Sequence, residues 1–133
     1  MILISHRGNI DGKNIKKEND PQYLQDTLKK GYHIEVDIWY KKSIWYFGHD
    51  YAQYKIGNNQ KLKNFCKKNI NKIWFHCKNV KALENMKDTN YNYFWHNRDK
   101  IKEYIFSRLT SINSINTTAN YYIFMMFLSH FFS

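Results

Sequence analysis

The sequence predicts an α/β fold built from parallel strands that are joined by helices. Segments with strand character lie at residues 2–5, 32–38, 44–48, 71–77 and 91–95. Segments with helical character lie at about residues 21–30, 59–68 and 79–88. Strands separated by helices form parallel βα units with right-handed connections, and the chain contains about four such units. This alternation, together with the cap and turn residues between the segments, predicts the fold class.

The first helical segment has clear start and stop signals. Asp20 is the expected N-cap, Pro21 fits the first helical position, and Gly31 stands where a C-terminal glycine belongs. An apolar stripe at helical spacing is formed by Tyr23, Leu24, Thr27 and Leu28. We therefore expect a helix with one apolar face.

The later connections differ in length. Segments 32–38 and 44–48 lie too close together for a helical crossover, so we expect a hairpin-like pair around residues 41–43. The helical segment at 79–88 has Asn79 as its expected cap. Its inward-facing residues are expected to be Val80, Leu83 and Met86.

The βα pattern ends at about Asp99. Residues 100–120 carry Ser, Thr and Asn without clear periodicity, and residues 121–133 form an apolar run. That run is shorter than the about 20 residues of a transmembrane helix. We therefore expect a folded domain at residues 1–99 and an atypical tail at residues 100–133 that is truncated or poorly ordered. A last buried helix and an interfacial anchor are the alternatives for the apolar run.

Charge and cysteine content narrow the expected partners and the compartment. Lys and Arg number 21 against 11 Asp and Glu, which gives a formal net charge of +10. The lysines are spread along the chain in pairs, so nucleic acid is not the expected partner, while the charge would attract a phosphate substrate. The two cysteines form neither a metal-binding pair nor a disulfide framework. No signal peptide fits before His6, so a cytoplasmic setting is expected.

Paired carboxylates on one expected strand are the clearest chemical signal. Glu35 and Asp37 are two residues apart and point to the same face of the strand, while their neighbours are apolar. Two like charges at this spacing repel each other unless a cation lies between them, and a divalent metal ion is the usual solution. His6 follows the first apolar run, and His49 follows a glycine after the third. These residues form a set suited to acid–base and metal chemistry.

Four short motifs occur along the first part of the chain: His6-Arg7-Gly8, Glu18-Asn19, Glu35-x-Asp37 and His49-Asp50. In order and spacing they resemble the motifs of the glycerophosphodiester phosphodiesterase family, over about residues 1–99. The resemblance implies a (β/α)8 TIM barrel of the phospholipase-C-like phosphodiesterase type. Such a barrel typically needs about 250 residues, so the chain of 133 residues is expected to form a partial TIM barrel of about four βα units. Its unpaired edge is a place where the chain could oligomerise.

The resemblance also implies a role for each motif. His6 and His49 correspond to the family's acid–base pair, and Glu35 and Asp37 correspond to its metal ligands, with Ca²⁺ or Mg²⁺ as the expected cation. Arg7 corresponds to a phosphate ligand. In the family, a hydroxyl of the substrate attacks first to give a cyclic phosphate, which water then opens. Supporting roles fall to Glu18, Asn19 and Asp50, of which the last is expected to orient a loop or the neighbouring histidine.

The segment at residues 71–77 departs from the family pattern. Trp74, His76 and Lys78 are expected to share a face. The family usually has Glu-x-Lys here, so Lys78 matches as a phosphate-binding residue, while His76 stands where a third carboxylate ligand is expected. We include His76 in the predicted metal set, although imidazole suits Ca²⁺ and Mg²⁺ poorly. His96 is expected to point inward, either as a core histidine or as part of the pocket. The four tryptophans are expected to pack between sheet and helices.

The sequence therefore predicts a phosphoric diester hydrolase that acts on a small glycerophosphodiester-like substrate. His6 and His49 would transfer protons, and a divalent cation would assist. Two alternatives remain from the sequence. A barrel remnant without activity fits the incomplete pattern after residue 99, and a basic module that binds anions, nucleic acid or a membrane surface fits the charge.

Overall fold

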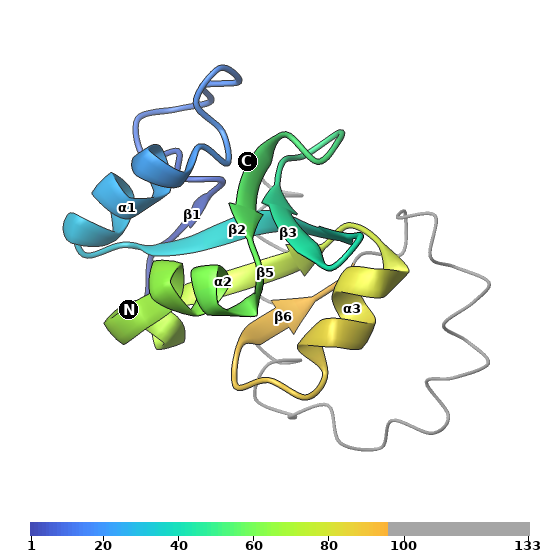
Figure 1. Cartoon of the computed structure of the whole chain (residues 1–133). Coiled ribbons are helices and arrows are strands. Elements are labelled where there is room, and N and C mark those ends of the chain that lie inside the picture. The colour runs from blue at the N-terminus through green and yellow to red at the C-terminus, as the bar shows by residue number, and fades with distance from the viewer. Residues whose placement is uncertain (96–133) are drawn as a thin grey trace.

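The computed structural model describes residues 1–95, which form a mixed β-sheet with helices on one face (Figure 1). Within these residues the strands are β1 (Ile4–His6), β2 (His33–Lys41), β3 (Ile44–Phe47), β4 (Tyr54–Gly57), β5 (Ile73–Cys77) and β6 (Asn92–Phe94). The helices are α1 (Pro21–Lys29), α2 (Asn59–Cys66), α3 (Val80–Met86) and a 3₁₀ helix, η1 (Lys67–Lys72). The predicted tail at residues 100–133 and His96 lie outside the described residues.

β2 is the centre of the sheet. Along one edge it pairs in parallel with β1 through its first residues and antiparallel with β3 through its last ones. Along the other edge it pairs in parallel with β5, and β6 continues the sheet beyond β5. β4 pairs antiparallel with β3, so the strand order is β4-β3-β2-β5-β6, with β1 beside the first half of β2.

The predicted TIM-barrel-type fold, a partial barrel of about four βα units, is wrong for the described part of the chain. The sheet is open and mixed, because the antiparallel strands β3 and β4 occupy the edge of β2 where a barrel would continue with parallel strands. Lys42 and Ser43 connect β2 to β3 with φ angles of 48° and 61°, as in the tight turns of hairpins. A parallel connection needs roughly a dozen residues or more. Among residues 1–95, no pairing closes β6 onto β1.

Local capping explains where the helices begin. Asp20, Asn58 and Asn79 each accept a hydrogen bond from the backbone N–H three residues ahead, at the starts of α1, α2 and α3. Asp20 and Asn79 are the caps predicted from the sequence. The side chain of Asn79 also ties α3 to β2, because it donates to the Tyr40 carbonyl (2.9 Å) and accepts from the Tyr40 N–H (3.2 Å). Within residues 1–95 no helix is long and apolar enough to cross a membrane.

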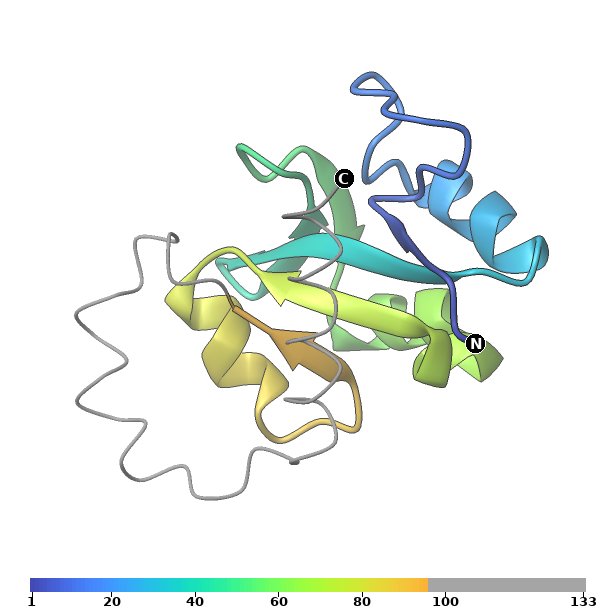
Figure 2. The same cartoon turned by 180° about the vertical axis from the view of Figure 1, so that it is seen from behind.

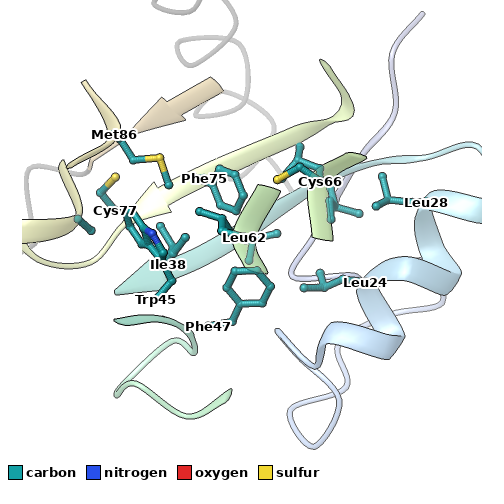
Figure 3. Packing of buried hydrophobic residues seen from close by; sticks show 14 residues of the cluster. Leu24, Leu28, Ile38, Trp45, Phe47, Leu62, Cys66, Phe75, Cys77 and Met86 are labelled. Carbon is teal, nitrogen blue, oxygen red and sulfur yellow. The ribbon is translucent and has the colours of Figure 1, made fainter. Parts of the chain in front are cut away.

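One hydrophobic cluster lies between the sheet and the helices (Figure 3). The two central strands contribute alternate residues, Ile34, Val36, Ile38, Ile73, Phe75 and Cys77. The helices contribute Leu24 and Leu28 from α1, Leu62 and Cys66 from α2, and Ala82 and Met86 from α3. All three α-helices therefore cover the same face of the sheet, and the opposite face carries the remaining residues of each strand.

β4 is the strand that the sequence analysis does not predict. It has four residues, none of them fully buried, so its apolar alternation is weak. It pairs with β3 through a register that shifts between Trp45 and Tyr46. The indole N–H of Trp45 donates to the side chain of Asn59 at 2.8 Å, which fixes the hairpin to α2.

Candidate metal and acid–base site

Alternation along β2 and β5 places a polar cluster on the face opposite the helices, the face that Figure 2 views. Glu35 and Asp37 come from β2, and His76 comes from β5 beside Asp37. The parallel pairing of β1 and β2 brings His6 beside Glu35. His49 closely follows β3, and its Nδ1 lies 3.4 Å from Oδ2 of Asp37. Side chains from four separate segments of the chain therefore meet at one place.

Asp37 is the most heavily contacted residue of the cluster. It is fully buried, and Nε of Arg7 forms an ion pair with its Oδ2 at 2.8 Å. Asn19 contacts the same residue twice, since its amide donates to Oδ2 at 2.9 Å and its carbonyl accepts from the backbone N–H at 3.0 Å. On the other side, Nδ1 of His76 lies 2.9 Å from Oδ1. These contacts hold the carboxylate in one orientation.

Glu35 lies between two imidazoles. Nε2 of His6 is 3.3 Å from its Oε2, and Nδ1 of His76 is 3.6 Å from its Oε1. The side chain of Glu35 is 3% exposed, whereas those of His6 and His49 are 36% and 41% exposed. The carboxylates therefore form the floor of the cluster, and a reactant arriving from solvent would meet the two imidazoles first.

The contact between His49 and Arg7 favours one tautomer of the imidazole. Nη2 of Arg7 lies 3.3 Å from Nε2 of His49. Because a guanidinium group only donates hydrogen bonds, this contact leaves a lone pair on Nε2 and the proton on Nδ1, which faces Asp37. Oδ1 of Asp50 lies 3.6 Å from Nε2, and the Asp50 side chain is 86% exposed. Asp50 therefore lies at the rim of the cluster.

Each nitrogen of the Arg7 guanidinium faces a partner inside the protein. Nε faces Asp37, Nη1 donates to Oε2 of Glu18 at 3.1 Å, and Nη2 faces His49. Asn9 donates to the other oxygen of Glu18 at 3.0 Å. Arg7 thus links three segments of the chain, and its predicted role as a phosphate ligand would require it to share these donors with the substrate.

Two residues of this network have a left-handed backbone. Arg7 has a φ angle of 57° and Asn19 one of 62°, a region that costs a non-glycine residue on the order of 1 kcal/mol. The N–H of Asn19 donates to the Arg7 carbonyl at 3.1 Å. At Gly8, with a φ angle of 91°, a Cβ would lie 2.9 Å from the Tyr23 ring of α1. Backbone strain beside a buried carboxylate is typical of functional sites.

Burial and neighbouring charges act in opposite directions on the carboxyl groups. Burial alone would raise the pKa of Asp37, but the adjacent imidazoles and the Arg7 guanidinium hold that pKa well below its ordinary value. Burial would also raise the pKa of Glu18, and the hydrogen bonds that it accepts from Asn9 and Arg7 lower it below its ordinary value. Both side chains are therefore carboxylates at neutral pH.

Glu35, Asp37 and His76 have the donor set for a metal ion. One ligand atom from each lies within 4.8 Å of the others. Glu35 and Asp37 are both buried, and a bound cation would offset the repulsion between two buried carboxylates. The site holds three acidic side chains, those of Glu18, Glu35 and Asp37, against one guanidinium, that of Arg7. These residues fit a divalent cation.

Two residues that orient the site, Asn9 and Trp39, are not among the site residues predicted from the sequence. Asn9 orients Glu18, and nothing in its sequence context marks it. Trp39 was expected only to pack, yet its indole N–H donates to the carbonyl of Gly48 at 2.7 Å, directly before His49. Its alternation with Glu35 and Asp37 on β2 was the available signal.

Lys78 is the predicted phosphate ligand that follows β5. Its backbone N–H donates to the Ile38 carbonyl at 2.9 Å, so the first residue after β5 stays beside β2. In sequence, Lys78 lies two positions beyond His76, just past the end of β5. Its predicted role stays a prediction.

The fold and the cluster together define an open α/β sheet that carries a buried carboxylate–imidazole site. No family model, no curated protein and no solved structure matches this chain. The resemblance to glycerophosphodiester phosphodiesterases therefore depends on the motif residues alone. A functional conclusion has to come from the geometry of the site.

Proposed function

We propose that the chain is a phosphoric diester hydrolase that cleaves a glycerophosphodiester-like substrate with two histidines and a divalent cation. The observation that carries the proposal is the pairing of each exposed imidazole with a buried carboxylate. His6 lies 3.3 Å from Glu35, and His49 lies 3.4 Å from Asp37. Carboxylates in such pairs orient the imidazole and favour its use as a general acid or base.

Cleavage of a phosphodiester requires two proton transfers. A neighbouring hydroxyl of the substrate attacks phosphorus and loses its proton to a base, while the departing alcohol takes a proton from an acid as its P–O bond breaks. The resulting cyclic phosphate is then opened by water, with the proton transfers reversed. Nε2 of His49 would act as the base once the attacking hydroxyl replaces Arg7 as the hydrogen-bond donor to its lone pair. His6 is then the acid.

The buried side chains support these transfers. Glu35, Asp37 and His76 would hold the cation, which when bound would stabilise negative charge on a phosphoryl oxygen. Asn19 and Arg7 keep the Asp37 carboxylate oriented toward this site. The formal charge of +10 would draw an anionic substrate toward the protein.

The test is hydrolysis by the purified full chain. Release of glycerol 3-phosphate from glycerophosphodiesters would be measured with added divalent cations and with a chelator. His6→Ala and His49→Ala should each lower turnover about a hundredfold or more, the usual effect of losing an acid–base catalyst. The pH profile of the unmodified chain should be bell-shaped, because one imidazole must be neutral and the other protonated.

His33→Ala is the matched control. His33 lies on the same face of β2 as Glu35, but its Nδ1 accepts from the indole of Trp74 at 3.4 Å, outside the cluster. Its loss should leave turnover within about twofold, since it makes no contact with the acid–base pair. Near-normal turnover in His49→Ala would contradict its assigned role. Absence of hydrolysis with every cation would favour the inactive remnant.

A further inference from the structure

We infer that the site prefers a first-row transition cation, such as Zn²⁺ or Ni²⁺, to Mg²⁺ and Ca²⁺. The inference depends on the proposed function only in assuming that a cation binds at Glu35, Asp37 and His76. Mg²⁺ and Ca²⁺ take oxygen ligands almost exclusively, whereas imidazole nitrogen suits the softer divalent cations of the first transition row. The nitrogen of His76 is therefore the feature that selects the ion.

His76 is held in the position of a ligand. Its Nδ1 lies 2.9 Å from Oδ1 of Asp37 and 3.6 Å from Oε1 of Glu35. Its ring stacks on Phe94 of β6, with centroids 4.9 Å apart and planes 8° apart. The side chain is only 11% exposed. A ring fixed on its face by an aromatic side chain and at its edge by two carboxylates is preorganised for binding.

An ion pair between protonated His76 and Asp37 is the rival explanation of this contact. A hydrogen bond from Nδ1 to Oδ1 of Asp37, 2.9 Å away, would hold these two atoms next to each other without an ion. The ligand atom of Glu35 lies within 4.8 Å of both, and a metal ion that binds among the three would take the place of that hydrogen. The metal titration separates the two explanations, because an ion pair alone gives no metal binding.

The charge of the site supports the same selection. A carboxylate at position 76 would complete an all-oxygen set and add one negative charge, which favours the hard cations. Imidazole instead provides a neutral donor. With two carboxylates remaining, the electrostatic attraction for Mg²⁺ or Ca²⁺ is weaker, while the bond from nitrogen to a transition cation is retained.

The test is a direct measurement of metal binding by the full chain. Binding of Zn²⁺ would be followed by calorimetry and by competition with a chromophoric chelator, with Mg²⁺ and Ca²⁺ as competitors and Ni²⁺ in a parallel titration. We expect Zn²⁺ to bind one site per chain at least about tenfold more tightly than Mg²⁺ or Ca²⁺. His76→Glu should reduce that ratio by about tenfold, because it restores an oxygen donor.

Two further variants make the outcome specific. His33→Glu introduces the same change on the same face of β2, outside the ligand set, so it should leave the ratio unchanged. If His76→Glu does not fold by circular dichroism, His76→Gln removes the nitrogen without adding charge. It should weaken Zn²⁺ binding about tenfold or more. A ratio that is near one, or that neither substitution at position 76 lowers, would overturn the inference.

Measuring hydrolysis beside metal binding distinguishes a failure of this inference from a failure of the proposed function. Hydrolysis supported equally by Mg²⁺ and Zn²⁺ would overturn the selectivity and leave the hydrolase assignment intact. Selective Zn²⁺ binding without hydrolysis of any phosphodiester would support the metal site and contradict the hydrolase. No binding of any of the four cations would overturn the inference and also remove the metal from the proposed function.

Discussion

The two faces of β2 and β5 are both buried, but different interactions stabilise them. On the helix-covered face the strands bury only apolar side chains, which pack in one cluster (Figure 3). On the other face the same strands bury Glu35, Asp37 and His76. Apolar burial is non-directional and needs only the exclusion of water. A buried charge needs a partner at a defined position.

This difference predicts which substitutions each face tolerates. A hydrophobic face accepts changes of shape that conserve volume. Substitutions that remove side-chain volume are therefore the ones that should destabilise it. The polar face is sensitive to a change of a single atom, because each oxygen of Asp37 has its own neighbours. Substitutions that alter volume on one face and charge on the other therefore test the comparison.

Phe75→Ala should have the largest effect on stability. Phe75 is fully buried in the cluster, near the rings of Phe47 and Tyr91. Its truncation removes buried area and leaves a cavity, so the free energy of unfolding should fall by about 3–5 kcal/mol. Urea unfolding followed by circular dichroism measures the change. Ile15→Ala, at an exposed site, should change stability by less than about 0.5 kcal/mol, and similar losses in the two variants would contradict the assigned core.

Asp37→Asn conserves volume and should still lower stability by about 3 kcal/mol, since it removes one partner of a buried ion pair. The guanidinium of Arg7 would lose the carboxylate that lies 2.8 Å from its Nε. Asp26→Asn is the matched control, because Asp26 pairs with Lys29 at the surface, where both side chains are exposed. That change should cost less than about 1 kcal/mol. Equal losses of unfolding free energy at the two positions would show that the buried Asp37–Arg7 pair stabilises the fold no more than a surface pair does.

The same pair predicts how stability depends on pH. The pKa of Asp37 is held well below its ordinary 3.8 in the folded chain, so folding favours the ionised form. Its contribution is therefore complete above about pH 4 and is lost as the pH falls below that value. Glu18 acts in the same direction. Unfolding free energies measured between pH 3 and 6 should fall less steeply in Asp37→Asn, and parallel curves would contradict the lowered pKa.

Local features of the fold were predictable from the sequence, but whether the sheet stays open or closes into a barrel was not. The cap at Asp20 and the close spacing of β2 and β3 are signals within a few residues, and the structure contains the predicted helix and hairpin. Barrel closure depends on whether strands far apart in the chain pair with each other. No local pattern specifies that, and the expectation came from the family resemblance.

The same distinction between local and long-range features applies to the candidate site. The period of two along β2 predicts that Glu35 and Asp37 share a face, and they do. The pairings that bring His6 beside Glu35 and His76 beside Asp37 depend on the registers of β1 and β5 against β2. Those registers follow from packing of the apolar face, which sequence patterns describe only one strand at a time.

Trp39→Phe should have the smallest effect on stability and a specific effect on the site. The indole N–H of Trp39 donates to the carbonyl of Gly48 at 2.7 Å, and the N–H of Gly48 donates to the Asp37 carbonyl at 3.1 Å. Gly48 has a φ angle of 150°, and a Cβ there would collide with the Tyr51 carbonyl oxygen. The two hydrogen bonds thus fix the residue directly before His49.

Loss of the Trp39 hydrogen bond should lower the free energy of unfolding by about 1 kcal/mol and release the backbone that positions His49. Trp45→Phe is the matched control, because the Trp45 indole on the apolar face of the same hairpin also makes one hydrogen bond, to Asn59 at 2.8 Å. Trp45→Phe should lose more stability in urea, because Trp45 is also buried in the apolar cluster, but only Trp39→Phe should shift the imidazole NMR signals of His49. If Trp45→Phe shifts those signals equally, the hairpin responds as one unit and Trp39 does not position His49.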